Sequence, residues 1–554
     1  MGISKVLTLT LGTIAMSVAM YPGTQANAQE LADDQTLVIG GVGADIKTLD
    51  PMFQTETMND VISHYMYSYL TQSPYGTMDF QNIEGDLAES WEILEGGKVW
   101  VFKIKQGVYF HDGNDIFAEG EAPELNAEDV KFSFDRMLDP ELGSPHRGEY
   151  DVIESIEVVD SHTVKFNLKF AYAFFDKIQT YDFKAGAIIS KAAAEKMEGT
   201  GNWGFAYTIG TGPFEFVEYV PKEKVVLKAN EDYFKGAPTI QNVEYRFMPD
   251  LNSRTLAFIA GEIDTVYGVR DPEWARNLAS AVPEATVDKV PLGSGGVLHY
   301  NMTREPLNDI RVRKALSLAI CRQTFADLFG PVRVEQTSIV PASYEGSLPK
   351  ETMAPELLYE CDLDEAKRLL DESGHGDGIK LWVSSSPRPT YRTVYVAVQE
   401  AWRKLGVELE IEMVDHTSYI SNVKSDKNDV VAYSADRTPI ADSYLTEFWH
   451  SSAIVGTPTG QKNFSHYGAL DADGDGLVDS IDWYIEEARK EVDPDRRRSL
   501  WELAQQKVLE DAAAKPLHVL IKVLGRQSWV DLGVDFTGTM AQTYPLERAR
   551  ILKH

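Results

Sequence analysis

A run of acidic residues near the C-terminal end of the chain has the spacing of a cation-binding loop. Carboxylates stand at positions 1, 3, 5, 9 and 12 of such a loop, a glycine at position 6 and a carbonyl donor at position 7. These residues are Asp471, Asp473, Asp475, Asp479 and Asp482, with Gly476 and Leu477. Alternate residues converge on one ion because the loop wraps around it, and calcium prefers oxygen ligands. The spacing predicts a structural calcium site, in which the short Asp482 can bind through a single oxygen.

The same residues also suit a plainer interpretation, a solvated acidic turn that leads into a helix beginning near Trp483. The elements that must position this loop include both strands and helices. β-rich segments alternate with segments of helical periodicity, which is typical of an α/β chain. The predicted strands are 36–40, 225–229, 243–248, 297–301, 379–384, 407–413 and 429–433, and the predicted helices are 252–260, 311–320, 363–370, 395–405, 483–488 and 496–509.

Two further segments give sharper local predictions. Val99 to Phe110 alternates apolar and polar residues in its first half, which predicts a β-hairpin. The stretch from Leu125 onward predicts a helix, because Asn126 is a good N-cap and Glu128 and Asp129 place acidic groups in the first turn.

Composition limits the class of protein. The chain has 554 residues, 43% of them hydrophobic and 10% aromatic, so it is globular and long enough for two or more lobes. Its formal net charge of −32 would repel phosphate backbones and anionic lipid. We therefore expect neither nucleic acid nor a membrane surface as a partner.

The N-terminus has the three parts of a secretion signal. Lys5 supplies a positive charge, residues 6–20 form an uncharged apolar run, and Ala26-Asn27-Ala28 offers small residues for cleavage. The run is too short to span a bilayer comfortably. We expect residues 1–28 to be a signal peptide cleaved after Ala28, and a soluble periplasmic protein, since no cysteine at that point offers a lipid anchor.

Cys321 and Cys361 are the only cysteines. An oxidising periplasm permits one disulfide between them, closing a loop of about 40 residues. Two buried thiols are the alternative, and the preference for the disulfide rests on the compartment alone.

Four blocks in order along the chain resemble the large solute-binding proteins of ABC importers, in the peptide-, dipeptide- and nickel-binding family (family 5). The first contains DLAESWEI, GVYFHDG and LNAEDVKFSFDRM within residues 86–137. IGTGPFEF with LKANEDYFKGAP, NSRTLAFIAGEIDTV and YNMTREPLNDIRVRKALSLAI follow within residues 209–320. Each block is mostly a structural pattern, and their shared order makes the resemblance specific across nearly the whole mature chain.

The resemblance implies a two-lobed periplasmic-binding-protein fold of the cluster C type, with an inserted subdomain and a hinge. The implied parts are a first lobe in three pieces (29–79, 205–298 and 517–554), the inserted subdomain 80–204 and the second lobe 299–516. Such a monomer encloses a small solute, with a peptide favoured, by hinge closure. It then delivers the solute to a permease in the inner membrane.

The resemblance also implies ligand-binding residues in the second lobe. Tyr433-Ser434-Ala435-Asp436 is similar to the segment whose carboxylate receives a peptide's ammonium, and Arg388 resembles the arginine that receives the carboxylate. A guanidinium suits this role because its planar fork engages both carboxylate oxygens. Plainer alternatives are a turn-capping Asp436 and an exposed Arg388, and the arginine's role can fall to Arg392 instead.

In the first lobe, Thr55, Glu56 and Thr57 stand where the family presents polar groups to the ligand. Glu56 departs from the dipeptide-binding pattern, which has a glycine there. Its charge can favour a cationic ligand or a polyol, which puts simple dipeptide specificity in doubt.

Enzymatic function is not expected. HExxH, GxSxG and P-loop patterns are absent from the sequence, and Gly40 to Asp45 falls short of a dinucleotide fingerprint. The alternatives that remain are a binder of an oligosaccharide or other non-peptide solute, and a secreted hydrolase that uses two carboxylates.

Overall fold

The computed structural model confirms a mixed α/β chain. The residues that it describes are 30–180, 186–197, 201, 203–269, 271–435, 437–457, 462–539 and 543–554. The expected signal peptide and Asp436 therefore lie outside the described residues. Within these ranges, no helix has the length and apolar character needed to cross a membrane.

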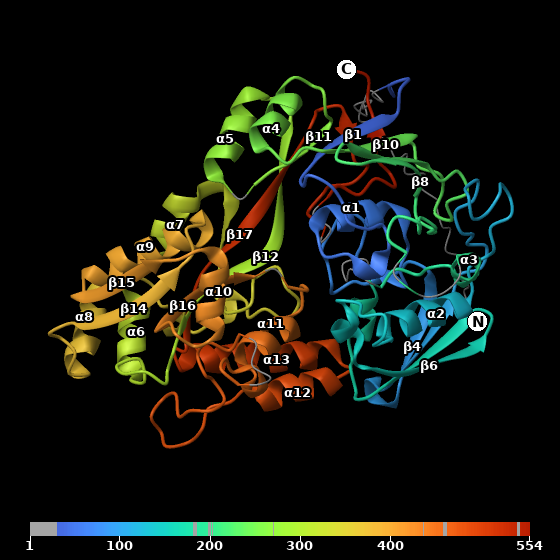
Figure 1. Cartoon of the computed structure of the whole chain (residues 1–554). Helices are drawn as coiled ribbons and strands as arrows, with labels where there is room; N and C mark the ends of the chain where they lie inside the picture. The colour runs from blue at the N-terminus through green and yellow to red at the C-terminus, as the bar shows by residue number, and fades with distance from the viewer. Residues whose placement is uncertain are drawn as a thin grey trace, which may run out of the picture.

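The largest sheet in the described chain has nine strands and runs through both halves of the molecule (Figure 1). Its order is β16-β12-β17-β11-β1-β10-β9-β8, with β13 pairing β17. The strands are β1 (Thr36–Gly41), β8 (Phe214–Val220), β9 (Lys224–Ala229), β10 (Asn242–Phe247), β11 (Thr265–Tyr267), β12 (Thr286–Tyr300), β13 (Arg333–Glu335), β16 (Val430–Ala435) and β17 (Ala514–Arg526).

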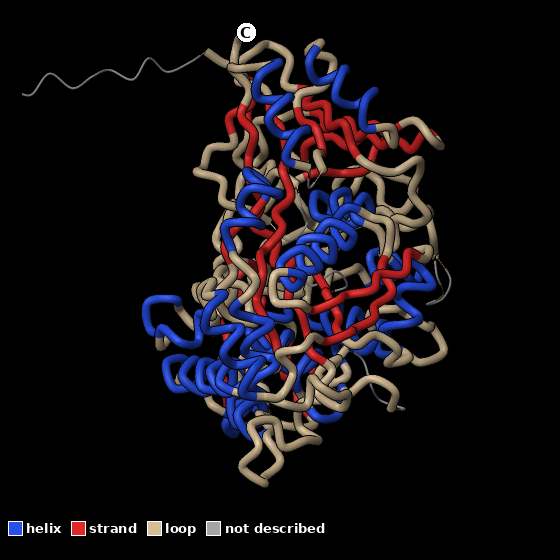
Figure 2. The backbone as a smooth tube through the Cα atoms, turned by 90° about the vertical axis from the view of Figure 1, so that its left-hand side faces the viewer, coloured by secondary structure: helices blue, strands red, loops and turns tan. Residues whose placement is uncertain are grey.

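Two long antiparallel strands, β12 and β17, connect the halves. Their pairing runs from Thr286 opposite Arg526 to His299 opposite Ala514, with register shifts beside Ser294 and Gly296. A Cβ on Gly296 would lie 3.0 Å from the carbonyl oxygen of His518, so glycine permits this close approach of the two backbones. Figure 2 shows long strands running down through the middle of the molecule.

The two halves have separate hydrophobic cores. The first contains β1, β8–β10, α1 (Thr57–Met66) and α2 (Ala127–Leu138), with Trp100 fully buried. The second contains three fully buried tryptophans, Trp402, Trp449 and Trp501. The helices that enclose the second core are α6 (Ile310–Leu318), α7 (Arg322–Phe329), α8 (Leu363–Glu372), α9 (Pro389–Arg403), α10 (His416–Lys424), α11 (Ala441–Trp449), α12 (Asp482–Lys490) and α13 (Pro494–Glu510), around the parallel pair β14 (Ile379–Ser385) and β15 (Val407–Met413).

A four-stranded antiparallel sheet of order β4-β5-β7-β6 belongs to the first half. Its strands are β4 (Ala88–Leu94), β5 (Val99–Ile104), β6 (Ile153–Asp160) and β7 (Thr163–Leu168). The predicted hairpin over Val99–Phe110 is wrong. The strand ends at Ile104, and its partners are β4 and the sequence-distant β7, with Val101 opposite Lys165.

The helix predicted from Asn126 is confirmed. α2 begins at Ala127, the Asn126 side chain accepts from Glu128 N at 2.8 Å, and the Asp129 carboxylate accepts from Asn126 N at 3.0 Å. This reciprocal arrangement satisfies backbone donors that the first turn leaves without helical partners.

The segment 172–179 joins the two cores through side chains. Phe174 packs on Trp501 of the second core, with ring centroids 5.6 Å apart, whereas Phe175 packs on Phe166 of the first, at 5.2 Å. The backbone N–H of Ala173 donates to Arg489 O at 2.8 Å. The molecule therefore has a connection between its halves in addition to β12 and β17.

A disulfide joins Cys321 to Cys361, with Cα atoms 4.7 Å apart. Cys321 immediately precedes α7, and Cys361 immediately precedes Asp362, the N-cap of α8. The bond therefore holds the starts of two helices of the second half together.

Candidate ligand-binding site

The structure brings two of the predicted second-lobe segments together. A narrow pocket lies between the first turn of α9 and the ends of the strands. Its lining residues are Gly296, Val297, Thr390, Tyr391, Val394, Ala432, Tyr433, Ser434, Leu517 and His518. Arg388 precedes this turn of α9 directly, and Tyr433 is held by its pairing with Val297 of β12.

Arg388 is an exposed cation at this place. Its carbonyl oxygen accepts from Tyr391 N and Arg392 N, so its backbone begins α9. Among the described residues its guanidinium has no ion pair. Burial, and then the Arg388 charge, lower the pKa of His416. A positive charge is therefore available beside the pocket.

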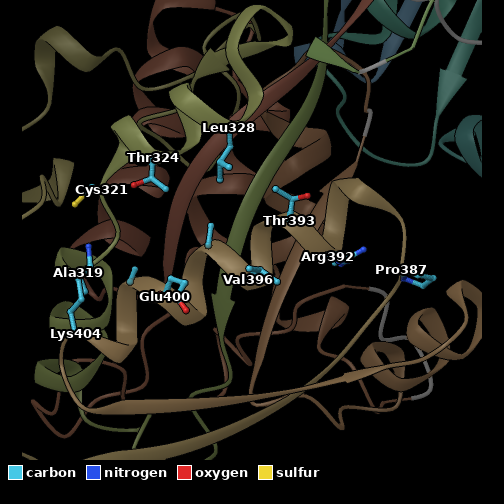
Figure 3. Close-up of a pocket in the computed structure, with 12 residues that line it drawn as sticks. Ala319, Cys321, Thr324, Leu328, Pro387, Arg392, Thr393, Val396, Glu400 and Lys404 are labelled. Atoms are coloured by element: carbon cyan, nitrogen blue, oxygen red, sulfur yellow. The ribbon is translucent and has the colours of Figure 1, made fainter. Parts of the chain in front are cut away.

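Arg392, the alternative to Arg388, lines a different pocket. This pocket of 580 Å³ lies between α7 and α9 (Figure 3). Apolar side chains such as Leu328 and Val396 share it with Glu400 and Lys404. The structure therefore separates the two arginines, and Arg388 is the one whose neighbours line the pocket at Tyr433.

Tyr433 is half-buried and divides two pockets. Its ring lies 5.2 Å from Phe464 and 5.8 Å from Phe448, between centroids. Burial raises the pKa of Tyr433 to about 12, so its hydroxyl stays protonated at neutral pH. The second pocket has aromatic walls and is lined by Gly295, Val297, His299, Ile339, Tyr433, Tyr444, Phe448 and Trp449.

Sequence reasoning missed three charged residues beside Tyr433. The Arg437 guanidinium binds both carboxylate oxygens of Glu447, and Lys462 Nζ binds the same carboxylate. Arg437 directly follows Asp436, so its position next to a predicted site residue could have identified it from the sequence. Glu447 lies on α11 and Lys462 lies later in the chain. Their spacing along the sequence therefore does not indicate that they meet at Arg437.

In the first-lobe segment, Glu56 forms a local ion pair. Its side chain does not cap α1, and the carboxylate instead pairs with Lys47. The charge that suggested a cationic ligand is therefore compensated locally. Thr55 is exposed and Thr57 opens α1, although the Thr57 side chain lies outside the description. In the described chain, no hydrogen bond or ion pair joins Thr55 or Glu56 to Arg388 or Tyr433.

The acidic loop gathers part of its predicted ligand set. Carboxylate oxygens of Asp471, Asp473 and Asp479 lie within 4.8 Å of one another. Hydrogen bonds from Gly476 N at 2.8 Å and Gly474 N at 2.7 Å lower the pKa of Asp471. Three carboxylates at this spacing can share one cation.

The other predicted carboxylates are directed elsewhere. Asp475 Oδ1 accepts from Leu477 N at 2.8 Å, and Asp482 accepts from Ser451 N at 2.9 Å. Asp482 is the first residue of α12, so its short side chain reaches the neighbouring backbone at Ser451 and not the loop. Asp479 also binds Lys507 Nζ, at 2.6 Å.

Comparison with known proteins decides the family. Residues 82–455 match the model for bacterial extracellular solute-binding proteins, family 5, middle part. The chain belongs to this family. The two-lobed fold predicted from the sequence is the fold of the family's solved structures.

Similar proteins cover most of the chain. It is 26% identical to the oligopeptide-binding protein AppA of Bacillus subtilis, over 92% of this chain and 91% of that one. It is 28% identical to the dipeptide-binding protein of Escherichia coli, over 77% and 79%. The structure of MoaA from A. tumefaciens R10 in complex with mannopinic acid is 31% identical, with a TM-score of 0.70 over 94% and 100%.

Proposed function

We propose that this protein is the solute-binding component of an ABC importer, which captures a peptide or a related small solute between its lobes. One observation carries the proposal. The α9 turn that follows Arg388 and the β16 segment that contains Tyr433 line one pocket of the second lobe. Relatives named for oligopeptide and dipeptide binding align with most of the chain, which supports a peptide. Delivery is to a permease in the inner membrane.

The charges match the two ends of a peptide. Arg388 binds the carboxylate through a bidentate, charge-assisted hydrogen bond. In this proposal the ammonium is received by Asp436, which lies outside the residues that the structure describes. Hinge closure brings Thr55, Glu56 and Thr57 to the ligand from the first lobe.

A non-peptide solute is the second candidate. MoaA, solved with mannopinic acid, is similar to this chain at 31% identity, and the aromatic walls at Tyr433, Phe448 and Trp449 suit a stacking ligand. A solute without a carboxylate would depend on Tyr433 more than on Arg388. Calorimetry of Tyr433→Ala and Arg388→Ala therefore separates the two candidates.

The protein binds its solute without turnover in this proposal. The test is isothermal titration of the purified protein with a dipeptide panel, followed by mass spectrometry of the recovered ligand. Saturable binding with unchanged ligand is the expected result. Hydrolysed peptide would overturn the proposal in favour of a secreted hydrolase.

We also place the mature protein in the periplasm as a monomer. The apolar run before Ala28 supports export, and cleavage there leaves Gln29 as the first residue. Intact-mass analysis of the periplasmic fraction would detect this N-terminus. A chain that retains residues 1–28 would contradict it.

Calcium at the acidic loop is the final part of the proposal. Asp471, Asp473 and Asp479 supply the first oxygens, and the ion fixes a surface loop of the second lobe. Titration with Ca²⁺ should give one site in the wild-type protein and none in Asp471→Asn. Equal heats in the two proteins would remove the proposal, and Asp151→Asn is a matched control on an exposed carboxylate elsewhere.

A further inference from the structure

The irregular part of β12 lies where the two halves of the molecule meet. Val290 of β12 belongs to the first core, and Val297 belongs to the second. From Val290 onward, β12 advances four residues to reach Ser294, whereas β17 advances two over the same stretch. The extra residues of β12 form a bulge without partners in the ladder, and paired strands bend at a bulge. The two long strands can therefore bend here with little loss of ladder hydrogen bonds.

The segment 172–179 binds both halves through consecutive residues. Tyr172 N donates to Gly97 O of the first half at 3.0 Å, and Ala173 N donates to Arg489 O of the second half at 2.8 Å. Carbonyl groups in the last turn of a helix lack partners within the helix, so Ala173 satisfies one such group near the end of α12. Neighbouring backbone groups of one segment therefore hold one half each.

The contact that this segment makes with the second half is buried as deeply as the cores. Phe174 and Trp501, whose rings pack together, are both 0% exposed. Lys177 is 4% exposed, and its partner Glu345 is 5% exposed. Separation of the halves at this place would bring both aromatic rings into water and remove a carboxylate from Lys177. Because the free energy of separation grows with the apolar area exposed, bending at the β12 bulge is the easier motion.

The two connections between the halves stand apart in the molecule. β17 pairs with β11 near the top of Figure 1, whereas α12 and α13, which the segment 172–179 contacts, lie near the bottom. Two bodies that are joined at two separate places keep one easy relative motion, which is rotation about the line through both places. A motion that preserves both connections is therefore a rotation about the line from the β12 bulge to the segment 172–179.

We propose that the segment 172–179 is a second pivot of the hinge, which stays bound to α12 and α13 while β12 and β17 bend at the bulge. The inference rests on the proposed capture of a solute between the lobes and specifies how the lobes move. The rotation closes the site near Tyr433 and leaves the segment in place. The buried charge cluster, formed by Glu345, Lys177 and Arg497, holds the pivot together.

Spin labels on exposed cysteines test the pivot, because pulsed electron spin resonance measures the distance between two labels. The pivot pair, Asp151→Cys with Arg496→Cys, spans the contact of the segment with the second half. The lobe pair, Ala44→Cys with Lys424→Cys, joins the halves elsewhere. On addition of the dipeptides Ala-Ala, Ala-Lys and Ala-Glu in turn, a dipeptide that binds should leave the mean distance of the pivot pair within about 2 Å and shorten that of the lobe pair by more.

Variants of Phe174 loosen the pivot on the side of the second half. In the ligand-free protein the pivot pair should give one narrow distribution of distances, and the lobe pair should give a broader one. Phe174→Leu and Phe174→Ala should both broaden the distribution of the pivot pair, the alanine variant more. Phe170→Ala, which removes an exposed aromatic ring just before the segment, should leave it unchanged. Thermal melting verifies that each variant is folded, and Phe174→Leu decides where Phe174→Ala does not fold.

The outcomes separate this inference from the proposed function. If a dipeptide shifts the pivot pair as far as the lobe pair, the pivot is wrong and the capture of a peptide stands. If no dipeptide shifts either pair, the capture of a peptide is wrong, and the ligand-free distributions decide on the pivot. A pivot pair as broad as the lobe pair then overturns it, as does a width that remains the same in a folded Phe174 variant.

Discussion

Two clusters of charged side chains differ in their place in the molecule and in their access to solvent. In the buried charge cluster, Glu345 binds Lys177 Nζ at 2.8 Å and Arg497 Nη2 at 3.4 Å, and all three side chains are 4–6% exposed. Asp176 adjoins them, and burial raises its pKa. Two cations there face two carboxyl groups. In a second cluster, here called the pocket charge cluster, Arg437 and Lys462 bind Glu447, and the three side chains are 15–25% exposed.

The difference separates a structural role from a binding role. Lys177 belongs to the segment that places Phe174 in one core and Phe175 in the other, so the buried charge cluster fixes the contact between the halves. Its charges are satisfied within the protein. The pocket charge cluster lies beside Tyr433, which lines two pockets. Removing one partner of a buried ion pair destabilises the fold, whereas charged groups beside a pocket are candidates for binding a ligand.

The largest expected effect comes from breaking the buried charge cluster. Glu345→Ala leaves Lys177 and Arg497 buried without their shared carboxylate, and should lower the free energy of unfolding by about 3–5 kcal/mol. Urea denaturation measures this change. Asp151→Ala removes an exposed carboxylate that pairs with Lys169, and should cost less than about 1 kcal/mol. Equal losses in the two variants would refute the structural role of the cluster.

Removing the disulfide allows a second comparison, between its effect on stability and its effect on ligand affinity. Replacing both Cys321 and Cys361 by serine should destabilise the protein by about 2–4 kcal/mol, since the unfolded chain regains the freedom of the loop. Because neither cysteine lines a pocket with Tyr433, the ligand affinity of the folded variant should be unchanged. Calorimetry beside urea denaturation checks both parts, and lost affinity in a fully folded variant would contradict the separation.

On the binding side, Arg388→Ala should weaken peptide binding by more than about 2 kcal/mol, because the ligand carboxylate loses its cation in a desolvated place. Arg392→Ala, four residues later and lining the α7–α9 pocket, should leave the affinity within about 3-fold. Calorimetry measures both variants. The opposite ranking would move the site to the α7–α9 pocket.

A fall in pH should lower the free energy of unfolding through the buried side chain of His299. Burial lowers the pKa of His299 to about 3, from an ordinary value of 6.5. The unfolded chain therefore takes up a proton that the folded chain refuses, so this contribution to stability is full above pH 6.5 and is lost as the pH falls toward 3. Between pH 6 and pH 4, His299→Leu should show a slope of unfolding free energy against pH that is shallower by about 1.4 kcal/mol per unit. Parallel slopes would contradict this assignment.

Local signals in the sequence predicted local structure well. The cap at Asn126 and the strand pattern at Thr36–Gly41 depend on neighbouring residues, and the structure has both elements. The hairpin at Val99 failed because β7, a partner from far along the chain, completes the sheet. Alternation along one strand identifies a strand and does not identify its partner.

The site was predictable only in part, for the same reason. Arg388 and Tyr433 came from resemblance to a family, and the structure brings their segments to one pocket. Glu447 and Lys462 are 15 residues apart and belong to no motif, so only the fold reveals their meeting at Arg437. The pairing of Glu56 with Lys47 was also invisible, since either side chain could have faced solvent.

Native mass spectrometry of the protein purified from its own periplasm tests the central claim most directly. The expected result is one small molecule per monomer, chemically intact and with a carboxylate, retained by the wild-type protein and by Arg392→Ala. Arg388→Ala should carry little or none of it. A wild-type protein that retains a solute without a carboxylate, or an Arg388→Ala variant that carries the same solute in equal amount, would contradict the claim.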